Sequence, residues 1–271
     1  MKIKYLTFLI FIVAFQGFTQ TKVCTFNIRF ENPNDGVHQW ENRKSAALNF
    51  IKIEQPDVIG MQEVLHSQIE FFNEFLPSYQ KVGVARDDGK MKGEYSPLYY
   101  NKQVYELIDS GTFWLSPEPK IPAKAWDAAL PRICSWAKLK NNESEEEILF
   151  LNTHFDHVGK EARKNSVDVI LSKIKEMGAD NKVILMGDFN LEPDTEPIQK
   201  IIDSNLQDSF NSELRLGTVG TYNAFQIGKN YDRRIDYIFQ NGFEVINYTT
   251  YSLRVNDTFL SDHFPVLVEL K

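Results

Sequence analysis

The sequence lacks the features that mark several large classes of protein. Its 271 residues include only 2 cysteines, which excludes a small scaffold held together by disulfides. Its 30 basic residues are outnumbered by 37 acidic ones, giving a net charge of −7. Proteins that grip nucleic acid by its phosphates usually carry a basic face instead. The apolar run over residues 5–15 is too short to span a bilayer comfortably. These absences favour a globular chain whose ligand is small or weakly held.

The N-terminus has the pattern of a secretory signal peptide. Lys2 and Lys4 precede the apolar run over residues 5–15, and small residues follow it. This pattern predicts a signal peptide over residues 1–20 and a mature domain over residues 21–271. A buried N-terminal strand or helix is the alternative. We expect a secreted or periplasmic protein with no stable membrane insertion after cleavage, and one more acidic once both lysines are removed.

The two cysteines, Cys24 and Cys134, could pair in an oxidising compartment. Both lie in apolar, strand-like surroundings, which are typical of buried free thiols. We therefore expect them to be unpaired.

Apolar periodicity predicts the order of helices and strands. Helices are expected over residues 40–54, 66–76, 160–177 and 196–203. Strands are expected over residues 22–30, 57–63, 80–86, 96–100, 104–114, 132–139, 148–154, 234–239 and 243–253, with a further strand from Val183 and a final element over 261–268 whose polar residues precede the strand. Helices and strands alternate in each half of the chain. This pattern predicts an α/β fold in which two mainly antiparallel sheets pack together and helices cover both outer faces, a four-layered α/β/β/α sandwich.

One apolar run leads directly into polar residues. Residues 183–186 are all apolar and are followed by Gly187, Asp188, Phe189 and Asn190. Such a run predicts a strand buried on both faces that delivers Asp188 and Asn190 to its C-terminal edge. Because Asp and Asn often cap turns, a turn without chemistry explains this motif equally well when it is taken alone.

Other predicted strands also end on, or follow, polar side chains. These are Asn27, Glu63, His154, Asp236, and Asp262 with His263. Mg²⁺ prefers oxygen ligands from a few carboxylates, which Glu63 with Asp262 or Asn27 could supply. No Lys or Arg is evident beside Glu63, so we expect a metal rather than an ion pair there. Zinc would require more His and Cys side chains than converge at these strand ends.

These motifs, in this order, resemble those of the endonuclease/exonuclease/phosphatase superfamily, which has the deoxyribonuclease I-like fold. The resemblance covers nearly the whole mature chain and suggests a secreted bacterial member. It is carried by Thr25-Phe26-Asn27, Gln62-Glu63-Val64, Asn152-Thr153-His154, Gly187-Asp188-Phe189-Asn190, Ile235-Asp236-Tyr237-Ile238 and Ser261-Asp262-His263-Phe264-Pro265.

The resemblance implies a role for each of these polar residues. Glu63 would be the principal ligand of Mg²⁺, with Mn²⁺ as a possible substitute, Asp262 would assist, and Asn27 would hold metal or phosphate. Asp188 would deprotonate the attacking water, which Asn190 would orient. His263 would contact the scissile phosphate with its ring fixed by Asp236, and His154 would contact a non-bridging oxygen or help the leaving group.

Several of these residues also have simpler interpretations. Asp236 follows two arginines and could form an ion pair, and His263 could be a core histidine. His157 could take the place of His154. Arg132 and Arg163 could each grip a substrate phosphate or form ordinary ion pairs. The segment Glu94-Tyr95-Ser96 resembles segments that wall the site in bacterial members of the superfamily.

The function implied is hydrolysis of a phosphodiester or phosphomonoester by direct attack of an activated water, assisted by Mg²⁺. The substrate would be phosphorylated, and possibly a nucleic acid or nucleotide. The deadenylase-like and nocturnin-like branch is similar and suggests an RNA exonuclease. Export and acidity favour nucleotides, sugar phosphates or scavenged nucleic acid. The alternative is an inert protein that keeps the fold in order to bind a phosphorylated ligand.

Overall fold

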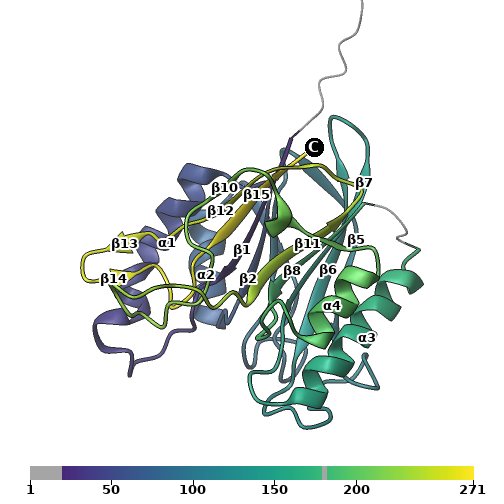
Figure 1. Cartoon of the computed structure of the whole chain (residues 1–271), viewed down its shortest axis with the longest axis horizontal. Helices are drawn as coiled ribbons and strands as arrows, with labels where there is room; N and C mark the ends of the chain where they lie inside the picture. The colour runs from purple at the N-terminus through teal and green to yellow at the C-terminus, as the bar shows by residue number, and fades with distance from the viewer. Residues whose placement is uncertain (1–19, 179–181) are drawn as a thin grey trace, which may run out of the picture.

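Two β-sheets pack face to face in the computed structural model, with helices on both outer faces (Figure 1). The structure describes residues 20–178 and 182–271. Apart from residue 20, the predicted signal peptide lies outside the described residues. The layers run helix, sheet, sheet, helix, so the predicted α/β/β/α sandwich is confirmed.

The first sheet has 7 strands in the order β10-β12-β15-β1-β2-β4-β3. Its strands are β1 (Thr21–Asn27), β2 (Val58–Gln62), β3 (Tyr79–Val82), β4 (Leu98–Asn101), β10 (Arg215–Leu216), β12 (Val245–Thr250) and β15 (Val266–Leu270). Helices α1 (Trp40–Glu54) and α2 (His66–Phe75) cover its outer face (Figure 1).

The second sheet has 6 strands in the order β5-β6-β7-β8-β11-β9. Its strands are β5 (Tyr105–Trp114), β6 (Ile133–Asn141), β7 (Glu147–His154), β8 (Val183–Asp188), β9 (Gln207–Asp208) and β11 (Asp236–Asn241). Helices α3 (Lys160–Glu176) and α4 (Glu196–Asp203) cover it. A small pair of strands, β13 (Arg254–Val255) and β14 (Thr258–Phe259), stands apart, and two 3-10 turns are η1 (Gly36–His38) and η2 (Ser209–Asn211).

Three apolar clusters hold these layers together. One lies between the two sheets and includes Phe150, Ile184 and Val268, all fully buried. The others lie between each sheet and its helices, where Ile51 and Val167 are also fully buried. Central strands therefore bury both faces, which explains why β8 reads as a continuous apolar run rather than as an alternating one.

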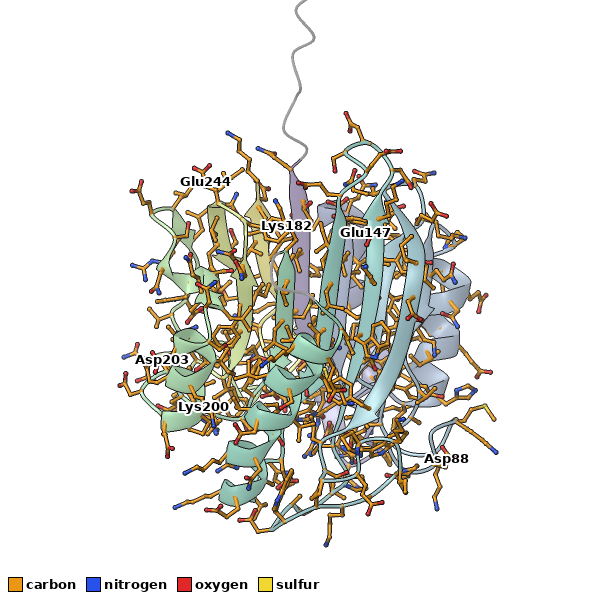
Figure 2. The ribbon with its side chains drawn as sticks, turned by 90° about the vertical axis from the view of Figure 1, so that its right-hand side faces the viewer. Asp88, Glu147, Lys182, Lys200, Asp203 and Glu244 are labelled. Atoms are coloured by element: carbon orange, nitrogen blue, oxygen red, sulfur yellow. The ribbon has the colours of Figure 1, made fainter. Side chains whose placement is uncertain are left out.

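Strand direction gathers the polar motifs at one end of the sandwich. β1 runs parallel to β2, and β7 runs parallel to β8, so their C-terminal ends share an edge. β11 and β15 run antiparallel to β8 and β1 and therefore begin at that edge. Glu147 and Lys182 mark the N-terminal ends of β7 and β8 and lie in the upper part of the molecule in Figure 2, so the polar edge lies toward the bottom.

Most predicted elements form, with some differences at their ends. The strand predicted over 80–86 stops at Val82, because Gly83 takes a φ of +109° and turns the chain. The strand predicted over 243–253 is shorter at both ends. The pair β13 and β14 was not predicted, because two-residue strands carry no periodic signal. Both cysteines are free and buried, as expected. No helix among the described residues is long and apolar enough to cross a membrane.

Candidate active site

Asp188 ends β8 and stands at the centre of the polar edge. Its Oδ1 accepts a hydrogen bond from the backbone N–H of Asn190 at 2.9 Å, and its Oδ2 accepts one from Asn27 Nδ2 at 3.0 Å. Asp188 is 1% exposed. Burial, followed by the charge of Asp236, raises the pKa of this carboxyl to about 6. A base with a pKa near neutrality is suited to accept a proton from water.

The backbone around Asp188 is built for close approach. Gly187 has a φ of +147°, and a Cβ there would lie 2.1 Å from the carbonyl oxygen of Thr153 on β7. Only glycine fits such a position. Asn190 then takes a left-handed φ of +49°, which Asn tolerates better than most residues. Together the two turn the chain so that Asp188 and Asn190 both reach the same site.

His263 and Asp236 form a buried pair beside Asp188. His263 Nδ1 lies 2.9 Å from Asp236 Oδ2, and its Nε2 lies 3.7 Å from Asp188 Oδ2. Burial alone would lower the pKa of the imidazole, but the charges of Asp236 and Asp188 outweigh burial and raise it well above its usual value. The ring is therefore held as a cation with one nitrogen directed toward Asp188.

His154 lies on the other side of Asp188 in a different state. Its Nε2 is 3.2 Å from Asn190 Nδ2 and 3.5 Å from Asp188 Oδ2. Burial, reinforced by the charges of Arg132 and Arg86, lowers the pKa of this histidine well below its usual value. A neutral ring that accepts a hydrogen bond from Asn190 through Nε2 carries its proton on Nδ1.

Glu63 follows β2 and marks a second, acidic part of the site. Its Oε1 accepts a hydrogen bond from Asn27 Nδ2 at 3.1 Å. Arg29 Nη1 lies 3.7 Å from Glu63 and 3.9 Å from Asp262. The expectation that no basic residue stands beside Glu63 is therefore wrong. Burial, then the charges of Asp262 and Glu94, nevertheless raise the pKa of Glu63 to about 7, so Arg29 compensates the carboxylate only in part.

The residues around Glu63 fit a hard divalent cation. Glu63 and Asp262 present carboxylate oxygens to the same pocket, and oxygen is the donor that Mg²⁺ prefers. Burial and the neighbouring carboxylates raise the pKa of Glu63, and a divalent cation would offset both effects. Asn27 Oδ1 accepts the backbone N–H of Arg29 at 3.0 Å. Asn27 Nδ2 donates to both Glu63 and Asp188 and holds the two carboxylates in position.

Asp188, Asp236 and His263 are a second conceivable metal group, since their ligand atoms lie within 4.8 Å of one another. The imidazole of His263 already supplies positive charge between the two carboxylates, and its Nδ1 is used by Asp236. A metal would have to displace that proton. The Glu63 group needs no such exchange and fits a cation better.

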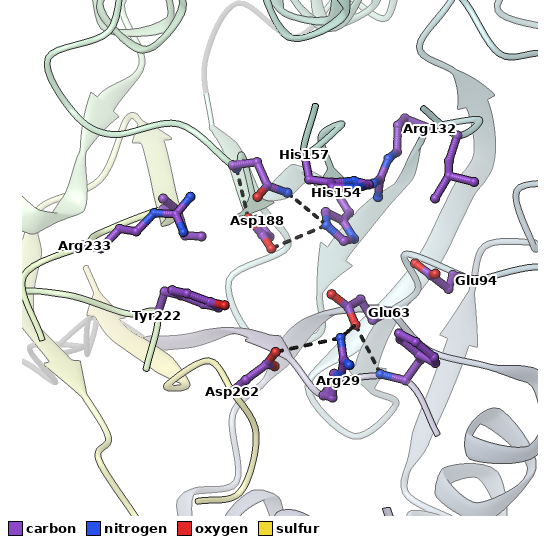
Figure 3. Close-up of a pocket in the computed structure, with 14 residues that line it drawn as sticks. Arg29, Glu63, Glu94, Arg132, His154, His157, Asp188, Tyr222, Arg233 and Asp262 are labelled. Carbon is purple, nitrogen blue, oxygen red and sulfur yellow. Dashed lines mark hydrogen bonds and ion pairs between the residues drawn. The ribbon is translucent and has the colours of Figure 1, made fainter. Parts of the chain in front are cut away.

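These groups surround an open pocket of about 440 Å³ (Figure 3). It is lined by Arg29, Phe30, Glu63, Glu94, Leu130, Arg132, His154, His157, Asp188, Asn190, Tyr222, Arg233, Ile235 and Asp262. The structure thus brings most predicted site residues to one pocket. Asn27, Asp236 and His263 do not line it but are buried against the residues that do.

The two arginines predicted to grip phosphate are placed differently. Arg132 lines the pocket, where its Nε lies 3.3 Å from Asp156 Oδ2. Arg163 does not line the pocket, and its Nη1 donates to the carbonyl oxygen of Asp156 at 2.9 Å. Arg163 thus contacts the segment that anchors Arg132.

The simpler interpretation of Asp236 as an ion pair with its neighbouring arginines does not match the structure. Arg234 pairs with Asp208 at 2.7 Å, and Arg233 Nε lies 3.9 Å from Glu192. Asp236 instead pairs with His263. His157 lies 3.0 Å from Arg132 through Nδ1 and also lines the pocket, whereas His154 is the histidine that contacts Asn190.

Sequence reasoning did not assign Arg29 or Tyr222 to the site. Arg29 has a left-handed φ of +58° just after β1, which turns its side chain toward Glu63. Tyr222 reaches the pocket from an irregular segment through an isolated bridge to His263. Nothing in the pattern of residues around Tyr222 could have placed it, whereas Arg29 follows a strand end that was already expected to carry site residues.

Comparison with protein families identifies the chain. A model described as the Endonuclease/Exonuclease/phosphatase family matches residues 24–263. The chain belongs to this family. The matched range includes every residue discussed for the site. Members of the family are hydrolases that act on phosphoester bonds, and they generally use a divalent metal.

Proteins with similar sequences or structures come from bacteria and from a virus. A family protein from Bacteroides vulgatus is 38% identical, with a TM-score of 0.89 over 93% of this chain and 99% of that one. A mannosyl-6-phosphatase from Bacteroides thetaiotaomicron is 36% identical, with a TM-score of 0.88 over the same shares. An uncharacterised protein of Acanthamoeba polyphaga mimivirus is 30% identical over 91% of this chain and 98% of its own length.

The similarity to human nocturnin is more distant. The catalytic domain of that protein is 21% identical, with a TM-score of 0.73 over 93% of this chain and 94% of its own. At this identity the similarity extends to the fold alone.

Proposed function

We propose that this protein is a Mg²⁺-dependent phosphoesterase that transfers a phosphoryl group from a small phosphorylated substrate to water. The observation that carries the proposal is the meeting of Asp188, Asn190 and His154 with the Glu63 and Asp262 carboxylates in one pocket of about 440 Å³. This volume lies toward the small end of the range for small-molecule sites, roughly 300 to 1,000 Å³. A sugar monophosphate suits it better than a polynucleotide.

The residues of the pocket can carry out direct attack by water. The Asp188 carboxylate accepts a proton from the water as its oxygen bonds to phosphorus. The His263 cation, fixed by Asp236, stabilises the negative charge that develops on the phosphoryl oxygens. Asn190, whose amide contacts His154, lines the same pocket and would orient the water. As the bond from phosphorus to the leaving oxygen breaks, the leaving alkoxide takes up a proton from solvent, and Asp188 then returns its proton to solvent, so that one water is consumed and an alcohol and phosphate are released.

Glu63 and Asp262 would hold the metal ion, which supplies charge neutralisation for the phosphoryl group when bound. Asn27 keeps Glu63 and Asp188 at a fixed separation, because one amide nitrogen donates to both carboxylates. The metal position and the catalytic base are thereby tied together.

The similarity to a mannosyl-6-phosphatase supports a sugar phosphate as substrate. The acidic net charge of −7 supports a small substrate over a long polyanion. An RNA exonuclease has less support, because the likeness to the nocturnin catalytic domain shows only the fold.

We also infer that the protein is exported, on the pattern over residues 1–20. Mass determination of protein recovered from its producing cell should show an N-terminus near Thr21, and an uncleaved chain would contradict export.

The test is a substrate panel with the purified protein. Mannose 6-phosphate, nucleoside monophosphates, a phosphodiester and single-stranded RNA are assayed with Mg²⁺ and again with EDTA. We expect release of inorganic phosphate from a small monoester, and its loss in EDTA. Asp188→Asn and His263→Ala should each lower kcat by about 10²- to 10⁴-fold. Asp194→Asn, an exposed aspartate shortly after the same strand, is the matched control.

The same panel separates an enzyme from an inert phospholigand-binding protein. A protein that binds mannose 6-phosphate but hydrolyses none of the panel would overturn the proposal. Full activity in Asp188→Asn would show that the assigned base is wrong.

A further inference from the structure

A second group of polar side chains lies on one wall of the pocket and has no part in the proposed reaction. Glu94 and Arg132 lie on the side opposite Tyr222 and Arg233 (Figure 3). Arg132 is 5% exposed, and two of its nitrogens have partners: Nε lies 3.3 Å from Asp156 Oδ2, and Nη2 lies 3.0 Å from His157 Nδ1. Its Nη1 is buried without a hydrogen-bond partner among the described residues. A buried guanidinium N–H rarely stays unsatisfied, so this nitrogen calls for a ligand atom.

Glu94 lines the same pocket and is held in place by Arg86. Arg86 donates to both of its carboxylate oxygens, at 2.7 and 2.8 Å. This bidentate pair fixes the orientation of the carboxylate. Each carboxylate oxygen has two lone pairs, so each can accept one further hydrogen bond from the pocket side. Glu94 is therefore a fixed acceptor of hydrogen bonds.

The backbone ties Glu94 to the predicted metal ligand. Tyr95 and Val64 exchange backbone hydrogen bonds at 2.8 and 3.3 Å, next to Glu94 and Glu63 respectively. A narrow crevice lined by Arg86, Glu94, Ser96, Arg132, Ile133 and His154 adjoins the main pocket and shares Glu94, Arg132 and His154 with it. Glu94 and Arg132 are thus held close to Glu63 and His154, which line the proposed phosphoryl site.

We propose that Glu94 and the free Nη1 of Arg132 form a hydroxyl-binding subsite that selects the alcohol part of the substrate. This inference rests on the proposed function and specifies its substrate class as phosphorylated polyols, such as hexose monophosphates. A sugar hydroxyl donates to Glu94, and another hydroxyl or the ring oxygen accepts from Arg132. A second phosphate would be repelled by the Glu94 carboxylate, which disfavours bisphosphates and nucleic-acid chains.

The test compares a polyol phosphate with a phosphate ester whose alcohol part carries no further hydroxyl groups. The ratio of kcat/KM for mannose 6-phosphate to that for 4-nitrophenyl phosphate is measured in the wild type, Glu94→Gln and Arg132→Met. We expect the ratio to fall about tenfold or more in each variant, because a site built to hydrogen-bond hydroxyls loses discrimination when that partner is removed. A merely structural role would lower both values together and leave the ratio unchanged. That outcome overturns the subsite.

Glu143→Gln is the matched control, because Glu143 is exposed in the acidic turn between β6 and β7. It should keep the wild-type ratio. If calorimetry shows that Arg132→Met weakens the binding of inorganic phosphate as strongly as the binding of mannose 6-phosphate, Arg132 is a phosphate contact and its role in the subsite is wrong.

Failure of the proposed function is distinguishable from failure of the subsite. If the wild type hydrolyses neither substrate, the phosphoesterase proposal fails, and calorimetry still tests the subsite. Mannose 6-phosphate should then bind more tightly than inorganic phosphate to the wild type, and Glu94→Gln should abolish that preference. Equal affinity of the wild type for the two ligands would overturn the subsite by itself.

Discussion

At the scale of single residues, Glu63 shows why the site favours the binding of a cation. Glu63 follows a buried strand, and its backbone has a left-handed φ of +60°. This conformation costs free energy in a residue other than glycine. Its nearest cation, Arg29, also forms two hydrogen bonds with Asp35 at 3.0 and 3.1 Å. Arg29 is thus shared among carboxylates, and Glu63 keeps a raised pKa.

The raised pKa of Glu63 predicts how stability depends on pH without metal. The folded-state pKa of about 7 lies above the ordinary value of 4.5, so the folded protein binds this proton more tightly than the unfolded chain. The free energy of unfolding should therefore fall as the pH rises from about 4.5 to about 7. Asp188, with a pKa of about 6, acts in the same direction.

Mg²⁺ should reverse this loss by neutralising the ionised carboxylate. We expect thermal unfolding to show a larger Mg²⁺-induced rise in Tm at about pH 8 than at about pH 5.5. Glu63→Gln should remove most of the Mg²⁺ effect, and Glu143→Gln should not. An equal rise in Tm at both pH values would contradict the assignment of Glu63 as a ligand.

Residues at or just past the ends of predicted strands, such as Glu63 and Asp188, could be predicted from the sequence. Their neighbours in the chain fix both the strand and the place where it ends. Arg29 and Glu94 could not be assigned in the same way, because their positions depend on the path of loops. Glu94 reaches the pocket only because a turn from Ala85 to Tyr95 folds back on Val64.

At the scale of elements, register decides which strand ends meet. His154 on β7 pairs with Asp188 on β8, which pairs in turn with Asp236 on β11. A slip of one residue would send every side chain of a strand to the opposite face and separate these groups. The sequence predicted the strands but not their order, because pairing between strands far apart in the chain leaves no local pattern.

Gly187 allows β8 to lie close to β7 in this register. Gly187→Ala should destabilise the protein by about 2 kcal/mol or more, because the new Cβ meets the Thr153 carbonyl oxygen and the backbone is left-handed. The matched control is Gly228→Ala, where φ is +78° but nothing lies within 4 Å of the new Cβ. Chemical unfolding of both variants gives the comparison. An equal loss in the two would show that the contact with β7 is unimportant.

At the scale of the whole molecule, the acidic balance of charge shapes which substrates approach. The pocket collects basic side chains in Arg29, Arg132 and Arg233, but each has an acidic group nearby. Their positive charge is therefore partly neutralised, which favours a small anion over a long polyanion.

The dependence of activity on salt should therefore be shallow. Raising the salt concentration from about 50 to about 200 mM costs proteins that contact many phosphates roughly 10³- to 10⁵-fold in affinity. For hydrolysis of mannose 6-phosphate we expect kcat/KM to change by less than about threefold over this range, because few charges are neutralised. A steep decline with salt would indicate a polyanionic substrate instead.

The pairing of Thr21 with Leu270 places the first and last strands of the domain side by side. Thr21 lies at the opposite end of β1 from Asn27, roughly 20 Å away at about 3.3 Å per residue, and Leu270 lies at the opposite end of β15 from His263, which precedes that strand. A fusion partner, affinity tag or surface linker joined at either end would therefore project from the rim opposite the pocket. Immobilised protein should keep an accessible mouth, and a short loop joining residues 271 and 21 would allow circularly permuted versions with new ends elsewhere.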